Sequence, residues 1–322
     1  MSNRQHLLLV APPSMSHTPA FDRAQALAKA TDASLYIVAF VYVETLEILG
    51  LIDADVRDRA REGYLRMHQD WLNVEAQCMR DEGVEVTTEV IWVKKPLDKI
   101  SKYVRSFNID MVIKDVHRES SLKRVFFTPL DWQLLRECEV PVHLVTDTRN
   151  PLPRKILATI DVTRDDDRVS GLNERIIQNG KDMATRCQAF LHVLSVYDWS
   201  SFYGPDVVFD KEPVLISPSY DKYKKIFEDV AKKHGVDHDH RHFIVGTPVK
   251  TISEYAHKNN YDIIVMGTVG HRTFNKLLGS TAENMLYRPP CSIIVIKPDE
   301  LADNKKFDER ADDLPDVHDY PF

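Results

Sequence analysis

The sequence has few cysteines and no long apolar run, and each absence limits what the protein can be. Its four cysteines, Cys78, Cys138, Cys187 and Cys291, are far apart, and no pair has the spacing of a metal site or a redox motif. We therefore expect reduced thiols and a cytoplasmic protein. The apolar run Leu7–Ala11 is too short for the core of a signal peptide. No segment approaches the roughly 20 apolar residues that a membrane-spanning helix needs.

An excess of positive charge and the common catalytic motifs are also missing. The chain of 322 residues has 42 Lys and Arg against 49 Asp and Glu, a net charge of −7. Proteins that bind nucleic acid without sequence preference are usually basic, so we expect no nucleic-acid partner. There is no nucleophile elbow, no HExxH motif and no phosphate-loop lysine. The sequence therefore predicts a protein that is not an enzyme, with a length that suits about two domains.

An internal repeat organises the chain. Six residues of the first half recur in the second half, each 152 positions later: Pro96, Ile100, Ser101, Tyr103, Asn108 and Asp110 match Pro248, Ile252, Ser253, Tyr255, Asn260 and Asp262. Identity at one fixed offset indicates a duplication. The segment 147–154 between the halves is rich in Pro and polar residues, which suits a linker. We expect a first domain over residues 1–148, a second over residues 154–300, and an extended acidic tail over residues 301–322.

Each half alternates expected strands with helical segments. The strands are expected near Leu7–Ala11, Leu35–Val43, Val84–Trp92, Met111–Lys114 and Val142–Val145, and near Ile156–Ile160, Ala189–Val196, His240–Val245, Ile263–Met266 and Ser292–Ile296. These runs are short, rich in Val, Ile and Leu, and mostly not alternating, which is typical of parallel strands covered on both faces. The fold class we predict is α/β, with two tandem, doubly wound parallel sheets. Ligands of such sheets bind beyond the carboxyl ends of the strands.

A glycine pattern follows the fourth strand of the second half. Gly267-Thr268-Val269-Gly270 comes directly after the apolar run, and Gly279-Ser280-Thr281 follows after eight more residues. Ser280 and Glu283 have the spacing of a capping box, so a helix is expected to begin there. Glycines between a strand and a helix N-terminus let free backbone N–H groups approach a phosphate.

The glycine pattern resembles that of the universal stress protein family, whose nucleotide signature is G-x2-G-x9-G-[S/T] after the fourth strand. The string Thr128-Pro129-Leu130-Asp131-Trp132 and the ending Val295-Ile296-Lys297-Pro298 add to the resemblance, which covers residues 1–300 as two tandem domains. It implies adenine nucleotide alpha hydrolase-like domains related by a pseudo-twofold axis, and a role in stress survival with protein partners unidentified. It also implies an intramolecular pair in which Val142–Val145 and Ser292–Ile296 lie antiparallel, with further dimerisation left open.

The resemblance also implies a binding site. Nucleotide-binding members use an aspartate after the first strand, a backbone position in the second strand, and the glycine loop. The matching positions here are Asp161, Val193, Met266, Gly267, Gly270, Gly279, Ser280 and Thr281. The expected ligand is ATP, ADP or AMP, and a role for Mg²⁺ is left open.

The glycine loop departs from the family pattern in its length. Gly270 and Gly279 are separated by eight residues instead of nine. We expect this to narrow the phosphate cradle, so that the site either favours adenosine, AMP or ADP over ATP or is empty. We expect Gly267→Asp to abolish binding and to leave the fold intact, because it places a charge where the phosphate would lie.

Structural interpretations compete with these roles. Gly and Ser can serve helix capping alone, and Asp161 can cap the turn 161–167. In the first half, Asp115, Arg118 and Thr128 replace the three glycines and Pro12-Pro13 replaces the aspartate, so we expect no nucleotide there. Two further functions stay open: an interaction or carrier protein that binds an apolar ligand, and a slow nucleotide phosphohydrolase.

A group of histidines allows a further hypothesis. His234, His238, His240 and His242 are close in sequence, and the last three alternate, so on a strand they would share one face. Three imidazoles on one face could bind zinc. Histidines at the exposed start of a strand are more often simply solvated, and we therefore assign no metal site.

Overall fold

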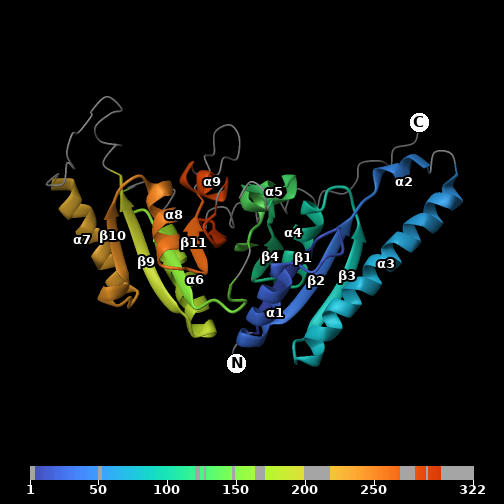
Figure 1. The fold of residues 1–322 in the computed structure, drawn as a ribbon, viewed down its shortest axis with the longest axis horizontal. Coiled ribbons are helices and arrows are strands. Elements are labelled where there is room, and N and C mark those ends of the chain that lie inside the picture. The colour runs from blue at the N-terminus through green and yellow to red at the C-terminus, as the bar shows by residue number, and fades with distance from the viewer. Residues whose placement is uncertain are drawn as a thin grey trace, which may run out of the picture.

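The fold is α/β and is built on one sheet that crosses the whole molecule (Figure 1). The computed structural model describes residues 4–49, 53–119, 124–126, 128–146, 149–163, 171–198, 218–268, 280–287 and 289–298. The predicted site residues Gly270 and Gly279 and the acidic tail 301–322 lie outside the described residues. Within the described residues, no helix is long and apolar enough to cross a membrane.

The first half contributes five strands to the large sheet, together with a small hairpin. The strands are β1 (His6–Ala11), β2 (Ser34–Val41), β3 (Val86–Trp92), β4 (Met111–Asp115) and β7 (Val142–Val145), and the hairpin is β5 (His117–Glu119) with β6 (Arg124–Phe126). The helices are α1 (Pro19–Thr31), α2 (Glu44–Leu49), α3 (Ala54–Asp81), α4 (Leu97–Ser106) and α5 (Pro129–Glu137).

The second half repeats this plan. Its strands are β8 (Lys155–Ile160), β9 (Phe190–Tyr197), β10 (Arg241–Val245), β11 (Ile263–Gly267) and β12 (Ser292–Ile296). Its helices are α6 (Leu172–Cys187), α7 (Pro218–Lys233), α8 (Pro248–Lys258) and α9 (Ser280–Tyr287), with a 3-10 turn, η3, at His238–His240. The five predicted strands of each half are all present, and Val142–Val145 and Ser292–Ile296 have the predicted bounds.

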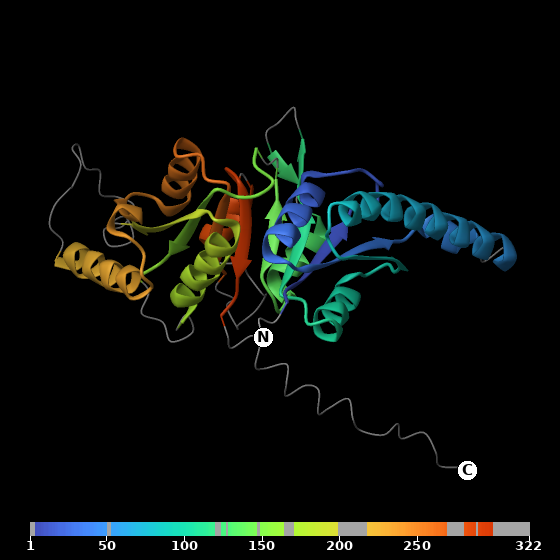
Figure 2. The same cartoon turned by 90° about the horizontal axis from the view of Figure 1, so that it is seen from below.

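The strand order shows the symmetry of the two halves. The order is β10-β9-β8-β11-β12-β7-β4-β1-β2-β3. Read inward from either edge, each half places its third, second, first, fourth and fifth large-sheet strands in the same order. All neighbours within a half are parallel, whereas β12 and β7 pair antiparallel at the centre, with Ile294 opposite His143 (Figure 2). This confirms the predicted intramolecular pair of last strands.

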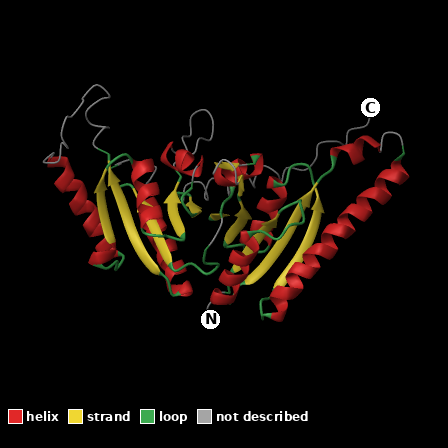
Figure 3. Ribbon diagram, viewed as in Figure 1, coloured by secondary structure: helices red, strands yellow, loops and turns green. Residues whose placement is uncertain are grey.

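Helices cover both faces of the sheet (Figure 3), and each face has its own core. On one face, α4, α5, α8 and α9 pack on a single apolar cluster that continues from one half into the other, from Leu8 to Val295. On the opposite face, α1 and α3 bury one cluster and α6 and α7 bury another. Because the first cluster spans the junction, burial of apolar surface holds the two halves together as well as each half.

Polar contacts reinforce the junction of the halves. Ser292 on β12 accepts a hydrogen bond from the backbone N–H of Thr146, at 3.2 Å from Oγ. Lys297 extends beyond β12 and is buried, and its Nζ donates to the carbonyl oxygens of Leu134 (3.4 Å) and Cys138 at the end of α5. A cation at the carboxyl end of a helix is favourable because it faces the negative pole of the helix dipole.

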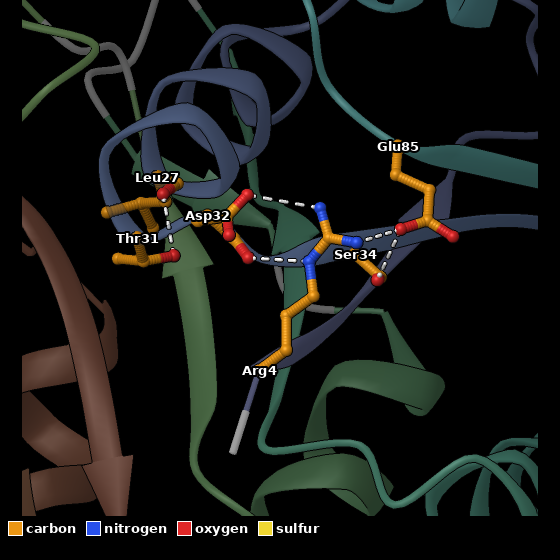
Figure 4. Close-up of polar contacts among 6 residues, drawn as sticks. All are labelled: Arg4, Leu27, Thr31, Asp32, Ser34 and Glu85. Atoms are coloured by element: carbon orange, nitrogen blue, oxygen red, sulfur yellow. Dashed lines mark hydrogen bonds and ion pairs between the residues drawn. The ribbon is translucent and has the colours of Figure 1, made fainter. Parts of the chain in front are cut away.

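At the amino ends of the strands, Arg4 contacts residues next to three elements, α1, β2 and β3 (Figure 4). Its guanidinium donates to the carbonyl oxygen of Asp32 at 2.8 Å, just after α1, and pairs with the Asp32 carboxylate at 3.1 Å. It also pairs with Glu85, which accepts from Ser34 at 3.1 Å. These contacts fix the end of α1 against the starts of β2 and β3. They lie at the amino ends of the strands, opposite to the carboxyl ends where the predicted site lies.

Candidate functional site

The candidate site lies where β8 and β11 end. The register pairs Thr159 of β8 with Met266 of β11, so Asp161 and Thr268, each two residues further on, stand at the same level. Within the sheet, β8 lies between β9 and β11, so the chain after β8 proceeds to one neighbour and the chain before the candidate loop comes from the other. The ends of β8 and β11 therefore form the topological switch point of the second half. Ligands of open α/β sheets bind at such points.

Asp161 is held in place at this edge. Its Oδ1 accepts from the backbone N–H of Thr163 at 2.9 Å and from the Thr163 hydroxyl at 2.7 Å. Its own N–H donates to Asn173 Oδ1 at 3.2 Å, and its carbonyl oxygen accepts from Asn173 Nδ2 at 2.8 Å. The turn-capping contact considered for this residue is therefore present. The side chain is exposed, and its position is fixed by the first turn of α6.

Gly267 ends β11 directly beneath α6. A Cβ atom at this position would lie 2.7 Å from Cδ2 of Leu172 and 2.9 Å from Cδ1 of Ile176, which is closer than carbon atoms can pack. Leu172 and Ile176 are both buried. A Cβ atom at this position therefore requires the side chains of Leu172 and Ile176 to shift. This crowding argues against the expectation that Gly267→Asp would leave the fold intact, which stays a prediction.

The remaining described site residues lie around this edge at different depths. Met266 is buried in β11. Val193 is buried in β9 opposite Ala158 of β8, three residues before the level of Asp161, or roughly 10 Å along the strand. Ser280 begins α9 and Thr281 lies in its first turn, and α9 lies at the same end of the sheet as the end of β11 (Figure 1). Asp161, Met266 and Gly267 are therefore brought together, and Val193 lies deeper in the sheet.

In the first half, an internal carboxylate occupies the corresponding helix start. Asp131 is 1% exposed, and its Oδ2 accepts from the backbone N–H and the hydroxyl of Thr128 at 2.6 and 2.9 Å. Its Oδ1 lies 2.7 Å from Nζ of Lys114, the penultimate residue of β4. A negative group at a helix N-terminus satisfies the free N–H groups that a phosphate would otherwise bind.

Sequence reasoning missed this buried ion pair. The spacing Thr-x-x-Asp at Thr128 and Asp131 was the signal that could have found the capping box. The partner lysine could not be inferred, because Lys114 and Asp131 are joined only when β4 and α5 pack together. With offset 152, Lys114 corresponds to Met266 and Asp131 to Glu283, so the second half has no such pair at these positions.

The histidines are arranged differently from the predicted row. His238 and His240 lie in the η3 turn and only His242 lies on β10, so the three do not share a strand face. His192 of β9 instead joins the group: its Nδ1 lies 2.9 Å from Nε2 of His242, and its ring centre is 4.2 Å from that of His240. The stack continues through Tyr255 to Tyr261. Within the described residues, no three His, Cys, Asp or Glu side chains are placed to hold a metal ion.

Burial favours the uncharged form of His192 and His242. Loss of solvent, together with the neighbouring His240 and His242, lowers the pKa of His192 to about 4. Burial likewise lowers the pKa of His242, with His240 adding to the effect. The group is therefore a packed aromatic edge of the second half at neutral pH.

Comparison with known proteins gives a consistent result. A family model described as the universal stress protein family matches residues 3–146 and, a second time, residues 154–297. Universal stress protein E of Escherichia coli strain K12 is 26% identical over 316 residues, which cover 97% of this chain and 100% of that protein. The universal stress protein E homolog of Haemophilus influenzae is 26% identical over 310 residues, covering 93% of this chain and 99% of that protein.

Solved structures agree with these sequence matches. A functionally unknown protein from Pseudomonas aeruginosa PAO1 has a TM-score of 0.71 and 25% identity, covering 97% of this chain and 98% of its own. A universal stress protein from Archaeoglobus fulgidus DSM 4304 has a TM-score of 0.66 and 19% identity, covering 92% of this chain and 99% of its own. The second likeness concerns the fold alone.

Proposed function

Because this chain belongs to the universal stress protein family, whose model matches each of its halves, we propose that it acts in the stress response by binding an adenine nucleotide. The observation that carries the proposal is the placement of Asp161 and Gly267 side by side at the switch point of the second half. An exposed carboxylate there can accept hydrogen bonds from ribose hydroxyls or an adenine amine. The N-terminus of α9, at the same end of the sheet, offers N–H groups to phosphate.

We propose a single nucleotide for each chain, bound in the second half. In the first half, the carboxylate of Asp131 already occupies the helix start and pairs with Lys114 at 2.7 Å. A phosphate brought there would meet a buried negative charge, which is strongly unfavourable. The second half also has a carboxylate at the equivalent position, the half-buried Glu283, but Met266 stands where the first half has Lys114, so the halves differ in the buried ion pair.

The proposal is for binding without robust turnover. Asp161 is the one predicted site residue with an ionisable side chain, and its Oδ1 is committed to Thr163. Mg²⁺ enters the proposal only with a nucleotide that carries it on its phosphates. The four cysteines are free thiols, which suits a reducing compartment, and we propose the cytoplasm.

Calorimetric titration of the full chain with AMP, ADP and ATP, each with and without Mg²⁺, tests the proposal. We expect one site per chain and, from the eight-residue spacing of Gly270 and Gly279, tighter binding of AMP or ADP than of ATP. Asp161→Asn keeps an acceptor for Thr163 but removes the charge, and it should weaken binding by about 10- to 100-fold, the value of a hydrogen bond to a charged group.

Asp182→Asn is the matched control, because Asp182 is exposed on α6 near the opposite edge of the sheet. It should bind nucleotide as the wild type does. Nucleotide should also appear in an acid extract of the purified protein if it binds tightly. Lipid-like material without nucleotide, or equal affinities of the wild type and Asp161→Asn, would contradict the proposed site.

A further inference from the structure

The helix α3 lies at the outer end of the first half, beside the edge strand β3 (Figure 1), and part of it projects beyond the sheet (Figure 2). It packs on β2 and β3. Four of its residues are buried, at spacings of three or four: His68, Leu72, Ala76 and Met79. Since successive residues of a helix are turned by about 100°, these four define the face of α3 that looks toward the sheet. The opposite face looks away from the molecule.

This opposite face of α3 carries apolar side chains. Val56, Met67 and Val74 are 43%, 46% and 65% exposed. The small residues Ala60 and Gly63 between them are exposed as well. A surface helix usually places polar residues on this side, and exposed apolar residues are normal where they are scattered singly. A row of them along one helix face is instead typical of an interaction site.

Together with Asp70, these residues form one straight row along α3, which we call the outer stripe: Val56, Ala60, Gly63, Met67, Asp70 and Val74. Their spacings alternate between four and three residues, which is the spacing of the seam between two packed helices. At a rise of 1.5 Å for each residue, the outer stripe is about 27 Å long. The small residues in its first half let a second helix approach closely.

The outer stripe is complementary to itself when two copies of α3 lie antiparallel. With the twofold axis at the level of Leu65, residues whose numbers add up to 130 face each other. Val56 then packs on Val74 of the second copy, and Met67 packs over Gly63 of the second copy. In a twofold dimer each of these contacts occurs twice, so the apolar positions of the stripe are covered along its whole length.

The charges along the stripe favour the same antiparallel arrangement. Asp70 is exposed and has no hydrogen-bond or ion-pair partner within the described residues. In this register it faces Ala60 of the second copy, beside Arg59, whose exposed guanidinium forms no ion pair within the described chain. A parallel pair would place Asp70 against Asp70, which is repulsive. Arg66 comes near its own copy at the axis, and Glu62, at 2.9 Å, offsets its charge.

We propose that the outer stripe is a dimerisation surface whose partner is α3 of a second copy of this chain, packed antiparallel about a twofold axis. The dimer forms through the outer end of the first half, so it leaves the β7–β12 pair and the proposed nucleotide site of the second half uncovered. A helix pair about 27 Å long is a small interface, and we expect a reversible dimer with a dissociation constant on the order of 10 μM.

Sedimentation velocity of the full chain from about 1 to 200 μM, at low ionic strength and with a reducing agent, tests this proposal. The mass should rise from 37.1 kDa toward twice that value. Met67→Glu buries a charge in the apolar row of each copy and should weaken the dimer on the order of 100-fold. Because Met67 is exposed in the single chain, urea unfolding of this variant at 1 μM should match that of the wild type.

Exchange of charges tests the antiparallel register. Asp70→Arg brings a positive charge to Arg59 of the second copy and should weaken the dimer about tenfold, and addition of Arg59→Asp should restore the wild-type affinity. Asp98→Arg, the same change at an exposed position of α4, is the matched control and should dimerise as the wild type does.

Two results would overturn the dimerisation surface: a wild type that stays at 37.1 kDa at 200 μM, and a dimer that Met67→Glu leaves unchanged. A double variant of Asp70→Arg and Arg59→Asp that recovers no affinity refutes the antiparallel pairing.

Discussion

At the scale of single residues, Gly267 is constrained by packing as well as by any ligand. The sequence pattern suggested a glycine that lets phosphate approach the backbone. The structure adds that Leu172 and Ile176 of α6 occupy the space where its side chain would lie. A substitution here changes the fold and the proposed site together. Asp161, whose side chain is exposed, is therefore the better residue for testing nucleotide binding.

Gly267→Ala should destabilise the protein by about 1–3 kcal/mol, the range for overpacking a buried site. Gly63→Ala is the control, since Gly63 lies on the exposed side of α3 and a Cβ there meets nothing within 4 Å. That second change should stabilise the protein by roughly 0.5–1 kcal/mol, the helical advantage of Ala over Gly. Urea denaturation of both variants measures the difference. Equal stabilities of Gly267→Ala and the wild type would show that α6 can move aside.

At the scale of elements, the ring stack formed by β9, η3, β10 and α8 makes the outer edge of the second half sensitive to acid. In the folded protein the pKa of His192 is lowered from 6.5 to about 4, and that of His242 is also lowered. The unfolded chain takes up protons more readily than the folded one below pH 6.5. The stabilising contribution of the neutral imidazoles is thus complete above pH 6.5 and is lost as the pH falls toward 4.

His192→Phe keeps a ring in the stack and removes its titration. Between pH 7 and pH 5 the wild type should lose more stability than this variant, by on the order of 1 kcal/mol after allowance for the partial exposure of the ring. Chemical denaturation at the two pH values measures this difference. His238→Gln, at a side chain that is 86% exposed, should behave as the wild type does. An identical loss in His192→Phe and the wild type would mean that the stack does not control the acid response.

Elements were predictable where the local pattern alone determines them. The apolar runs at β7 and β12 gave both strands with their observed bounds, because parallel and central strands are buried on both faces. The helix α2 and the β5–β6 hairpin were not predicted, because α2 has only six residues and each hairpin strand only three. The His192 contact and the Lys114–Asp131 pair were missed for another reason: each joins residues that only the tertiary packing brings together.

At the scale of the whole molecule, β12 is a central strand only because the first half is attached. All five of its residues are buried, and β7 covers the edge that β12 would otherwise expose. An isolated second half would have a five-residue apolar edge strand with unpaired backbone groups, which favours association with another chain.

We therefore expect residues 149–298, prepared alone, to form a homodimer through β12. Light scattering coupled to size-exclusion chromatography gives its mass, and amide exchange should show protected N–H groups along Ser292–Ile296. Addition of residues 4–146 should replace the homodimer by a one-to-one complex that restores the β7–β12 pairing. A monomeric second half with protected β12 amides would argue against this role of the junction.

The antiparallel joint of β7 and β12 also has an evolutionary consequence. In a dimer of identical chains every substitution appears twice, so neither site can change without the other. A covalent pair removes that restriction: Asp131 and Lys114 can close one helix start while the equivalent positions of the other half hold Glu283 and Met266. Fusion of the two copies therefore permits a division of labour that symmetry would forbid.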